Sequence, residues 1–131
     1  PADGDAPVTP DAPVGTVSKI TDEGFSVGRF ELNNANDLVV VCSLSEEHPD
    51  YTTAHAFCIG YMTGAINYYR AIADSPGMGG FICNDRPIPR TELVTAFLSW
   101  SAAHPQLDAA PAVENVMRAA AQKWPCPFPG R

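Results

Sequence analysis

The four cysteines constrain this chain more than any other feature of its sequence. Cys42, Cys58, Cys83 and Cys126 each lie beside a helix-like segment or its boundary, and no CxxC pair is present. An even number of dispersed cysteines indicates two disulfides rather than a metal site or a redox motif. Disulfides persist in oxidising compartments. We therefore expect a periplasmic or secreted protein that is small, stapled and mostly helical.

The pairing of these cysteines has two candidate solutions. We favour Cys58 with Cys83, because the loop over residues 74–82 can fold back along the helix before it. That choice leaves Cys42 with Cys126. A simple up-down bundle would favour Cys42 with Cys58 and Cys83 with Cys126 instead.

Length and charge limit the number of domains and the kinds of partner that the chain can have. At 131 residues one domain is the default, and 45% hydrophobic residues are enough for a core. The formal net charge of −7 argues against nucleic acid and anionic membrane as partners. No apolar run approaches the roughly 20 residues of a transmembrane helix. The chain starts at Pro1 without a methionine, so we expect that an export signal has been removed.

The N-terminal segment, residues 1–32, is expected to be an extended arm preceding a helical domain over residues 33–131. Residues 1–13 are rich in Pro, Asp and Ala and cannot bury enough surface to offset their ordering entropy. We expect them to form a flexible lead or an extended strap on a partner. Residues 14–32 carry two short apolar runs around Asp22-Glu23-Gly24. These runs predict either a weak hairpin or an ordered strap on the helices.

Apolar periodicity predicts the helices. Residues 34–44 follow Asn33 and Asn34, both good N-caps. Residues 51–73 give the strongest helical pattern and are apolar on most sides, which predicts a central helix. Its polar edge is formed by Thr63, Asn67, Arg70 and Asp74. Gly60 and Gly64 lie about one turn apart on it, and we expect them to permit a close approach of another backbone.

Two further helices follow a loop. Residues 90–103 carry Leu93, Phe97 and Trp100 on one face and end at His104-Pro105. We expect Asp108 to cap the last helix, which Pro125 stops. Its expected buried stripe is Val113, Val116, Met117, Ala120 and Trp124. The fold class is therefore all-α, a compact bundle of about four helices stapled by two disulfides.

No catalytic or cofactor motif is present. His55 and Cys58 are at i and i+3, and with Cys83 they could begin a zinc site, but the paired close spacings of zinc modules are missing. Cys58 could be a nucleophile next to His55, although a half-buried histidine beside a disulfide has the same pattern. We expect no enzyme activity, no metal and no cofactor.

The loop between the second and third helices is the expected partner-binding surface, together with the N-terminal arm. Met78 and Phe81 are apolar residues among glycines, and Asp74 begins the loop. Neither helix propensity nor a core stripe requires these two apolar residues. Exposed apolar loop residues can enter a cleft of a partner. The alternative is that Phe81 closes one end of the bundle beside Cys83.

Several motifs resemble the Rap1a/Tai immunity-protein family. Residues 57–64, FCIGYMTG, resemble its C-(L/I)-G-Y-(I/M)-x-G signature. The other matching elements follow in the family's order: Leu38 to Cys42, Cys83, Arg90 to Trp100, His104-Pro105, Pro111-Ala112 and Trp124-Pro125-Cys126. The resemblance covers roughly residues 35–127. It departs from the family at Asn84 to Pro87, where proline usually lies closer to the cysteine.

The resemblance implies a periplasmic, all-helical, disulfide-bonded protein without catalysis. Characterised relatives bind and block peptidoglycan amidases injected by a type VI secretion system, and are often dimeric. The shared motifs look like core and disulfide residues, which transmit a fold rather than a choice of partner. The alternative is a structural or accessory subunit docked on a larger envelope or extracellular assembly, which the long arm favours. The third hypothesis is a helical acid-stress chaperone, based on three histidines and a pI near 4.7.

Overall fold

The computed structural model describes residues 22–127 of the chain. Within that range it has four complete α-helices, two short 3-10 helices and no strand. Their bounds are η1 Val27–Glu31, α2 Ala35–Cys42, α3 Tyr51–Ala73, α4 Arg90–Ala103, η2 Pro105–Leu107 and α5 Ala112–Lys123. The predicted all-α class and the three helices expected over 34–44, 51–73 and 90–103 are confirmed.

Local signals explain where these helices begin and end. The Asn34 side chain accepts a hydrogen bond from the Asp37 backbone nitrogen at 3.0 Å, which caps α2 at a terminus that otherwise leaves N–H groups unpaired. Helix α4 begins directly after Pro89 and α5 directly after Pro111. Proline lacks the N–H that the first turn of a helix cannot use. None of the described helices is long and apolar enough to cross a membrane.

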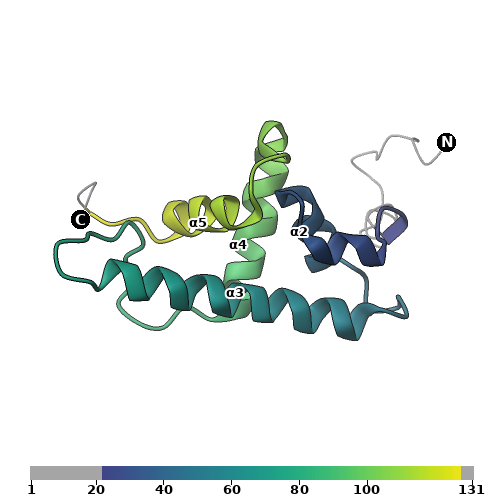
Figure 1. Cartoon of the computed structure of the whole chain (residues 1–131), viewed down its shortest axis with the longest axis horizontal. Coiled ribbons are helices and arrows are strands. Elements are labelled where there is room, and N and C mark those ends of the chain that lie inside the picture. Colours follow the sequence, from purple (N-terminus) through teal and green to yellow (C-terminus); the bar gives the residue numbers. More distant parts are fainter. Residues whose placement is uncertain (1–21, 128–131) are drawn as a thin grey trace.

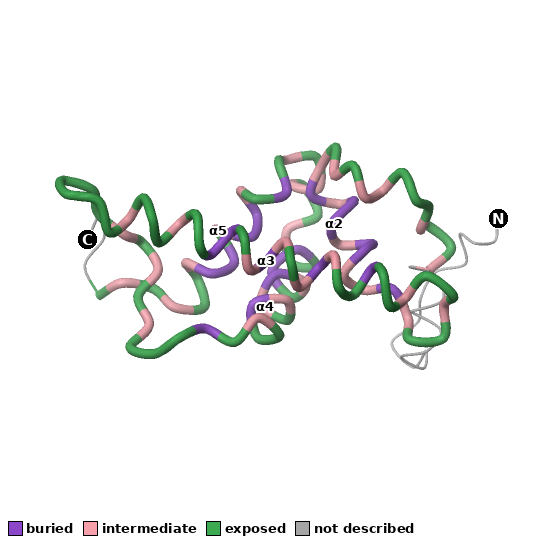
Figure 2. Tube along the Cα trace, turned by 60° about the horizontal axis from the view of Figure 1, so that its bottom comes forward, coloured by how far each residue is buried: buried purple, intermediate pink, exposed green. Residues whose placement is uncertain are grey.

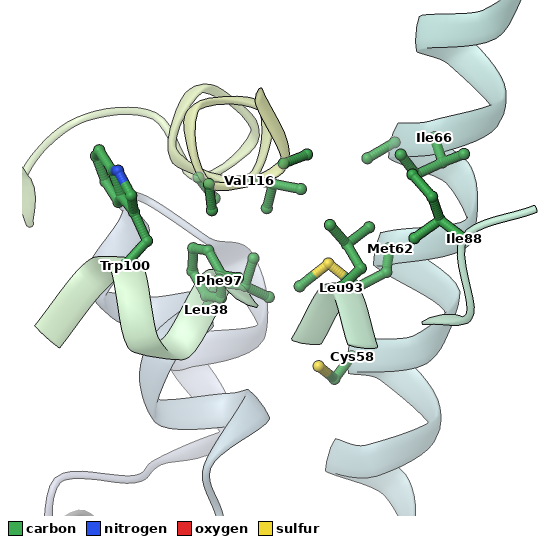
Figure 3. Packing of buried hydrophobic residues seen from close by; sticks show 13 residues of the cluster. Leu38, Cys58, Met62, Ile66, Ile88, Leu93, Phe97, Trp100 and Val116 are labelled. Carbon is green, nitrogen blue, oxygen red and sulfur yellow. The ribbon is translucent and has the colours of Figure 1, made fainter. Parts of the chain in front are cut away.

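The helices cross one another around one main core. Figure 1 shows α3 along one side of the molecule, α4 crossing it, and α2 and α5 on the two sides of α4. Figure 2 shows the buried segments gathered where α2, α4 and α5 meet the middle of α3. The largest buried side chains interleave there in Figure 3: Leu38, Met62, Ile66, Ile88, Leu93, Phe97, Trp100 and Val116.

Helix α3 is less central than its sequence predicts. Its buried residues are Ala54, Cys58, Met62, Ala65 and Ile66. Beyond them the helix continues past its neighbours, so Tyr68 and Ile72 are 69% and 39% exposed. Gly60 and Gly64 are also exposed, and a Cβ atom at either position would have no neighbour within 4 Å. The expectation that these glycines permit a close backbone approach is therefore wrong, because no helix of the described residues packs on that face.

Helix α5 differs from its prediction in both its start and its buried face. Asp108 does not cap it; the Asp108 carbonyl instead accepts a hydrogen bond from the Asn36 nitrogen at 3.0 Å. Val113 is 43% exposed, so the expected stripe is wrong at this residue. The residues that face the core are Ala112, Asn115, Val116, Ala119 and Ala120. Small alanines on this face let α5 lie close to its neighbours.

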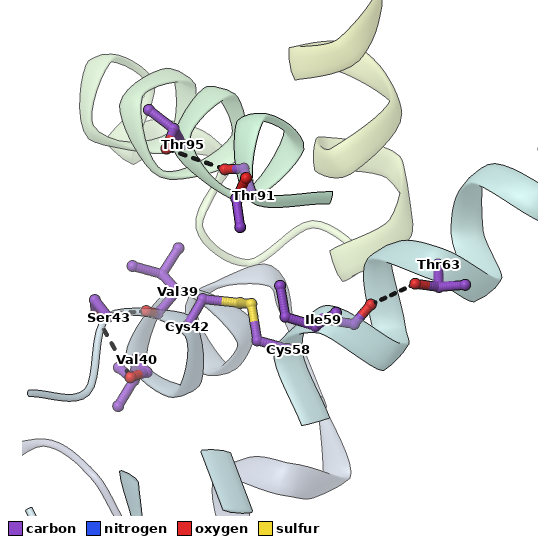
Figure 4. Close-up of a disulfide and its surroundings, with 9 residues drawn as sticks. All are labelled: Val39, Val40, Cys42, Ser43, Cys58, Ile59, Thr63, Thr91 and Thr95. Atoms are coloured by element: carbon purple, nitrogen blue, oxygen red, sulfur yellow. Dashed lines mark hydrogen bonds between the residues drawn. A yellow bond between two sulfur atoms is a disulfide. The ribbon is translucent and has the colours of Figure 1, made fainter. Parts of the chain in front are cut away.

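The cysteines pair as Cys42 with Cys58 and Cys83 with Cys126. The favoured pairing of Cys58 with Cys83 is wrong, and the pairing that a simple up-down bundle favours is the one observed. Residues 43–50 join α2 to α3, and Cys42 at the end of α2 is bonded to Cys58 of α3 (Figure 4). Segments 82–83 and 124–126 run side by side, with the Cys83 nitrogen donating to the Trp124 carbonyl at 2.8 Å.

Residues 22–32 pack on the helices, whereas residues 1–21 of the expected arm lie outside the described range. Phe25 and Phe30 contact a second core cluster made by Val41, Leu44 and Ala54. Arg29 Nη1 lies 2.8 Å from Asp37 Oδ1, and the Asp22 carboxylate accepts from Ser45. For residues 22–32 the hairpin interpretation is therefore wrong. These residues form an ordered strap on the helices.

Candidate protein-binding site

The loop between α3 and residue 82 begins with a tight turn. The Asp74 nitrogen donates to the Arg70 carbonyl at 3.0 Å, and the Met78 nitrogen donates to the Ser75 carbonyl at 3.1 Å. Gly77 has φ 80°, a left-handed conformation that glycine adopts without the steric cost of a side chain. This turn reverses the chain and places Met78 just after the reversal.

The second half of the loop is held by Tyr69 of α3. The Tyr69 hydroxyl accepts hydrogen bonds from the Phe81 and Ile82 backbone nitrogens, each at 2.8 Å. The Phe81 ring meets the Tyr69 ring edge to face, with centroids 4.9 Å apart. A Cβ atom on Gly80 would lie 2.5 Å from the Tyr69 hydroxyl oxygen. A residue without a side chain is therefore required at this position for the loop to reach Tyr69.

A disulfide then pins the base of the loop to the C-terminal segment. Cys83 is bonded to Cys126 directly after the Ile82 bridge to Pro125. The Cys126 sulfur also lies 3.6 Å from the Gly80 carbonyl oxygen. A loop that is fixed at both ends loses little further conformational entropy when a partner binds to it.

The three predicted partner-binding residues share this loop but differ in setting. Asp74 is exposed at its start, where it caps α3. Met78 is 55% exposed and packs against neither core cluster. Phe81 is 46% exposed and rests on Tyr69. The sequence pattern did not single out Tyr69 as part of this loop; the Gly79-Gly80 pair, which leaves room for its hydroxyl, was the available signal.

The sequence left a zinc site and a nucleophilic cysteine as alternatives. Cys58 is 2% exposed and bonded to Cys42, so it offers no thiolate to a metal or a substrate. His55 is exposed and stacks on Tyr51 with ring centroids 5.4 Å apart. Across residues 22–127 no group of three or more His, Cys, Asp or Glu side chains could hold a metal ion.

Together these features define a small, disulfide-stapled helical domain that presents a braced apolar loop. The sequence matches the family of Rap1a immunity proteins over residues 34–126, and the chain belongs to that family. Members of this family are immunity proteins, which bind a protein partner and generally have no catalytic activity. Comparisons with curated proteins and with solved structures give no match.

Proposed function

We propose that this chain is a periplasmic immunity protein that binds a peptidoglycan amidase effector and blocks its active-site cleft. The observation that carries the proposal is the match to Rap1a immunity proteins over residues 34–126. Two disulfides support the compartment, since disulfides persist where thiols are not kept reduced. The choice of an amidase injected by a secretion system as the partner rests on the resemblance to characterised relatives.

The loop over residues 74–82 is the proposed inhibitory element. Met78 offers exposed apolar surface at the loop tip, and burying such a side chain contributes about 1.5–3 kcal/mol. Phe81 extends the apolar surface toward α3. Asp74 adds a carboxylate at the margin of the loop, where a charge changes the association rate more than the final affinity.

Protection from the effector tests this function. The chain is expressed in the periplasm together with a peptidoglycan amidase effector from the same genome, and growth is recorded. We expect the unaltered chain to restore growth and Met78→Asp to weaken binding of the purified effector by tenfold or more, because a carboxylate in an apolar cleft must be desolvated.

Val113→Asp provides the matched control, because Val113 is an exposed apolar residue on α5, a different element. It should bind and protect like the unaltered chain. Failure of the unaltered chain to protect against the amidase would contradict the proposed function. Equal binding by Met78→Asp would contradict the role of the loop and leave the function itself standing.

The alternative is a structural or accessory subunit docked on a larger envelope assembly. The exposed Tyr68 and Ile72 favour it, since they lie one turn apart on α3 and together present apolar surface to solvent. Affinity capture from the native envelope with Tyr68→Asp would show loss of such an assembly. Sedimentation of the purified chain would show whether this face instead joins two copies in a homodimer.

A further inference from the structure

The polar edge of α3 forms a groove with the segment that leads into α4. The groove has a volume of about 370 Å³. Its polar lining residues are Asn67, Arg70, Asn84, Asp85, Arg86 and Arg90. Asn67 and Arg70 of the polar edge therefore form one wall of a concave site.

The charge of this groove opposes that of the chain. The chain has a formal net charge of −7 and only eight basic residues, yet Arg70, Arg86 and Arg90 line this single groove with Asp85 as its one carboxylate. Elsewhere in the described residues, Arg29 and Arg118 are ion-paired with carboxylates. No ion pair joins the three groove arginines to a carboxylate of residues 22–127. Their charge is therefore available to a ligand.

Hydrogen bonds hold part of this cationic surface in place. Arg90 Nε donates to the Thr63 hydroxyl and Arg90 Nη1 to the Ile88 carbonyl, both at 3.1 Å. Asn84 Nδ2 donates to the Arg86 carbonyl at 2.7 Å, which orders the turn before α4. Arg90 is half-buried, and its remaining N–H groups are oriented by the two bonds that it already makes. Preorganised guanidinium groups match the planar, bidentate geometry of carboxylates.

We propose that this arginine groove binds carboxylates on an acidic segment of the protein partner. The choice of a protein partner rests on the proposed function. It is also supported by position, because the neighbouring groove shares Arg70 and Ile88 with this one and reaches Tyr69 and Ile82 at the base of the loop. A partner that contacts the loop can therefore place a second, acidic contact here. Such a contact adds specificity and a faster association to the apolar one.

Titration of the full chain with a labelled acetyl-tetraglutamate peptide tests the groove without the effector. The double variant Arg70→Gln/Arg86→Gln changes two exposed residues that make no side-chain hydrogen bond among the described residues. We expect it to bind the peptide about fivefold more weakly, the size expected for two exposed ion pairs. Added salt should weaken binding of the tetraglutamate peptide to the unaltered chain. The uncharged peptide acetyl-tetraglutamine should bind the unaltered chain weakly, with an affinity no higher than that of tetraglutamate for the double variant.

Arg118→Gln/Lys123→Gln is the matched control, because it removes the same charge from α5. This variant should bind the peptide like the unaltered chain. An equal loss in both variants would overturn the proposal in favour of net charge alone. Inorganic phosphate that competes as tightly as the peptide would overturn it in favour of a small-anion site. These peptide-binding results do not depend on growth protection. A groove that fails to bind the peptide can therefore be distinguished from a chain that fails to protect against the amidase.

Discussion

The Tyr69 hydroxyl oxygen lies 2.8 Å from the Phe81 backbone nitrogen, from which it accepts a hydrogen bond. It accepts a second from the Ile82 nitrogen at the same distance. The Tyr69 side chain of α3 thus accepts the hydrogen bonds of two loop N–H groups that have no backbone carbonyl of residues 22–127 as partner. An N–H group that loses its partner and is not rehydrated is costly, so the loop conformation depends on this hydroxyl.

Tyr69→Phe removes this acceptor and keeps the ring. We expect a loss of about 2 kcal/mol in the free energy of unfolding, at about 1 kcal/mol for each hydrogen bond. Amide exchange at residues 81 and 82 should become faster. Tyr68→Phe is the matched control, since Tyr68 is 69% exposed and should tolerate the change. Unaltered exchange in Tyr69→Phe would show that the loop is held by Phe81 packing instead.

Gly60→Ala and Gly64→Ala should each stabilise the protein. Both glycines are in the interior of α3 with open space where a Cβ atom would lie. Replacing glycine by alanine in a helix interior gains about 1 kcal/mol. Thermal unfolding measures the gain. A lower melting temperature would indicate that a partner or a second copy covers this face under the conditions used.

Asp37→Ala should destabilise the attachment of residues 22–32. The Asp37 carboxylate accepts from Arg29 Nη1 and from the Asn33 nitrogen, each at 2.8 Å. Removing it leaves both donors without this acceptor, at a cost of about 1–3 kcal/mol. Glu114→Ala breaks the exposed Glu114–Arg118 pair and should cost less than about 0.5 kcal/mol. Equal losses by denaturant unfolding would contradict this ranking.

Peptide mapping without reduction should recover Cys42 linked to Cys58 and Cys83 linked to Cys126. The two bonds span 16 and 43 residues, so the chain-entropy estimate gives about 3 and about 4 kcal/mol. Replacing both cysteines of a pair by serine measures each loss. Recovery of a Cys58–Cys83 peptide from the native protein would contradict the structure.

Stability should fall at alkaline pH through Tyr61. Burial raises the pKa of the Tyr61 phenol above its ordinary value of 10.0, because the charged phenolate is poorly solvated there. Its contribution to stability is complete below the unfolded pKa and is lost as the pH rises through the folded pKa. Tyr61→Phe should therefore lose less stability between neutral and alkaline pH. Parallel curves of unfolding free energy against pH would contradict this role.

Only one wall of the arginine groove could be predicted from the sequence. Thr63, Asn67 and Arg70 are recognisable as one edge of a helix because residues three and four apart share a face. Arg86 and Arg90 lie in a separate segment, and nothing local indicates that they come to the same edge. The contact between Arg90 and Thr63 joins residues far apart in the sequence, so packing alone brings these cations together.

The sequence by itself determined the class, the family and the approximate bounds of α2, α3 and α4. Periodic apolar residues, the Asn34 cap and the prolines before α4 and α5 act over a few residues, and such local preferences are visible in the chain. The Cys42–Cys58 and Cys83–Cys126 pairing, the outward face of Gly60 and Gly64 and the Tyr69 brace were decided by the tertiary structure. Each depends on how far one helix extends past its neighbours and at what angle the helices cross. Those quantities are set by the joint packing of side chains from all the helices, which local periodicity does not encode.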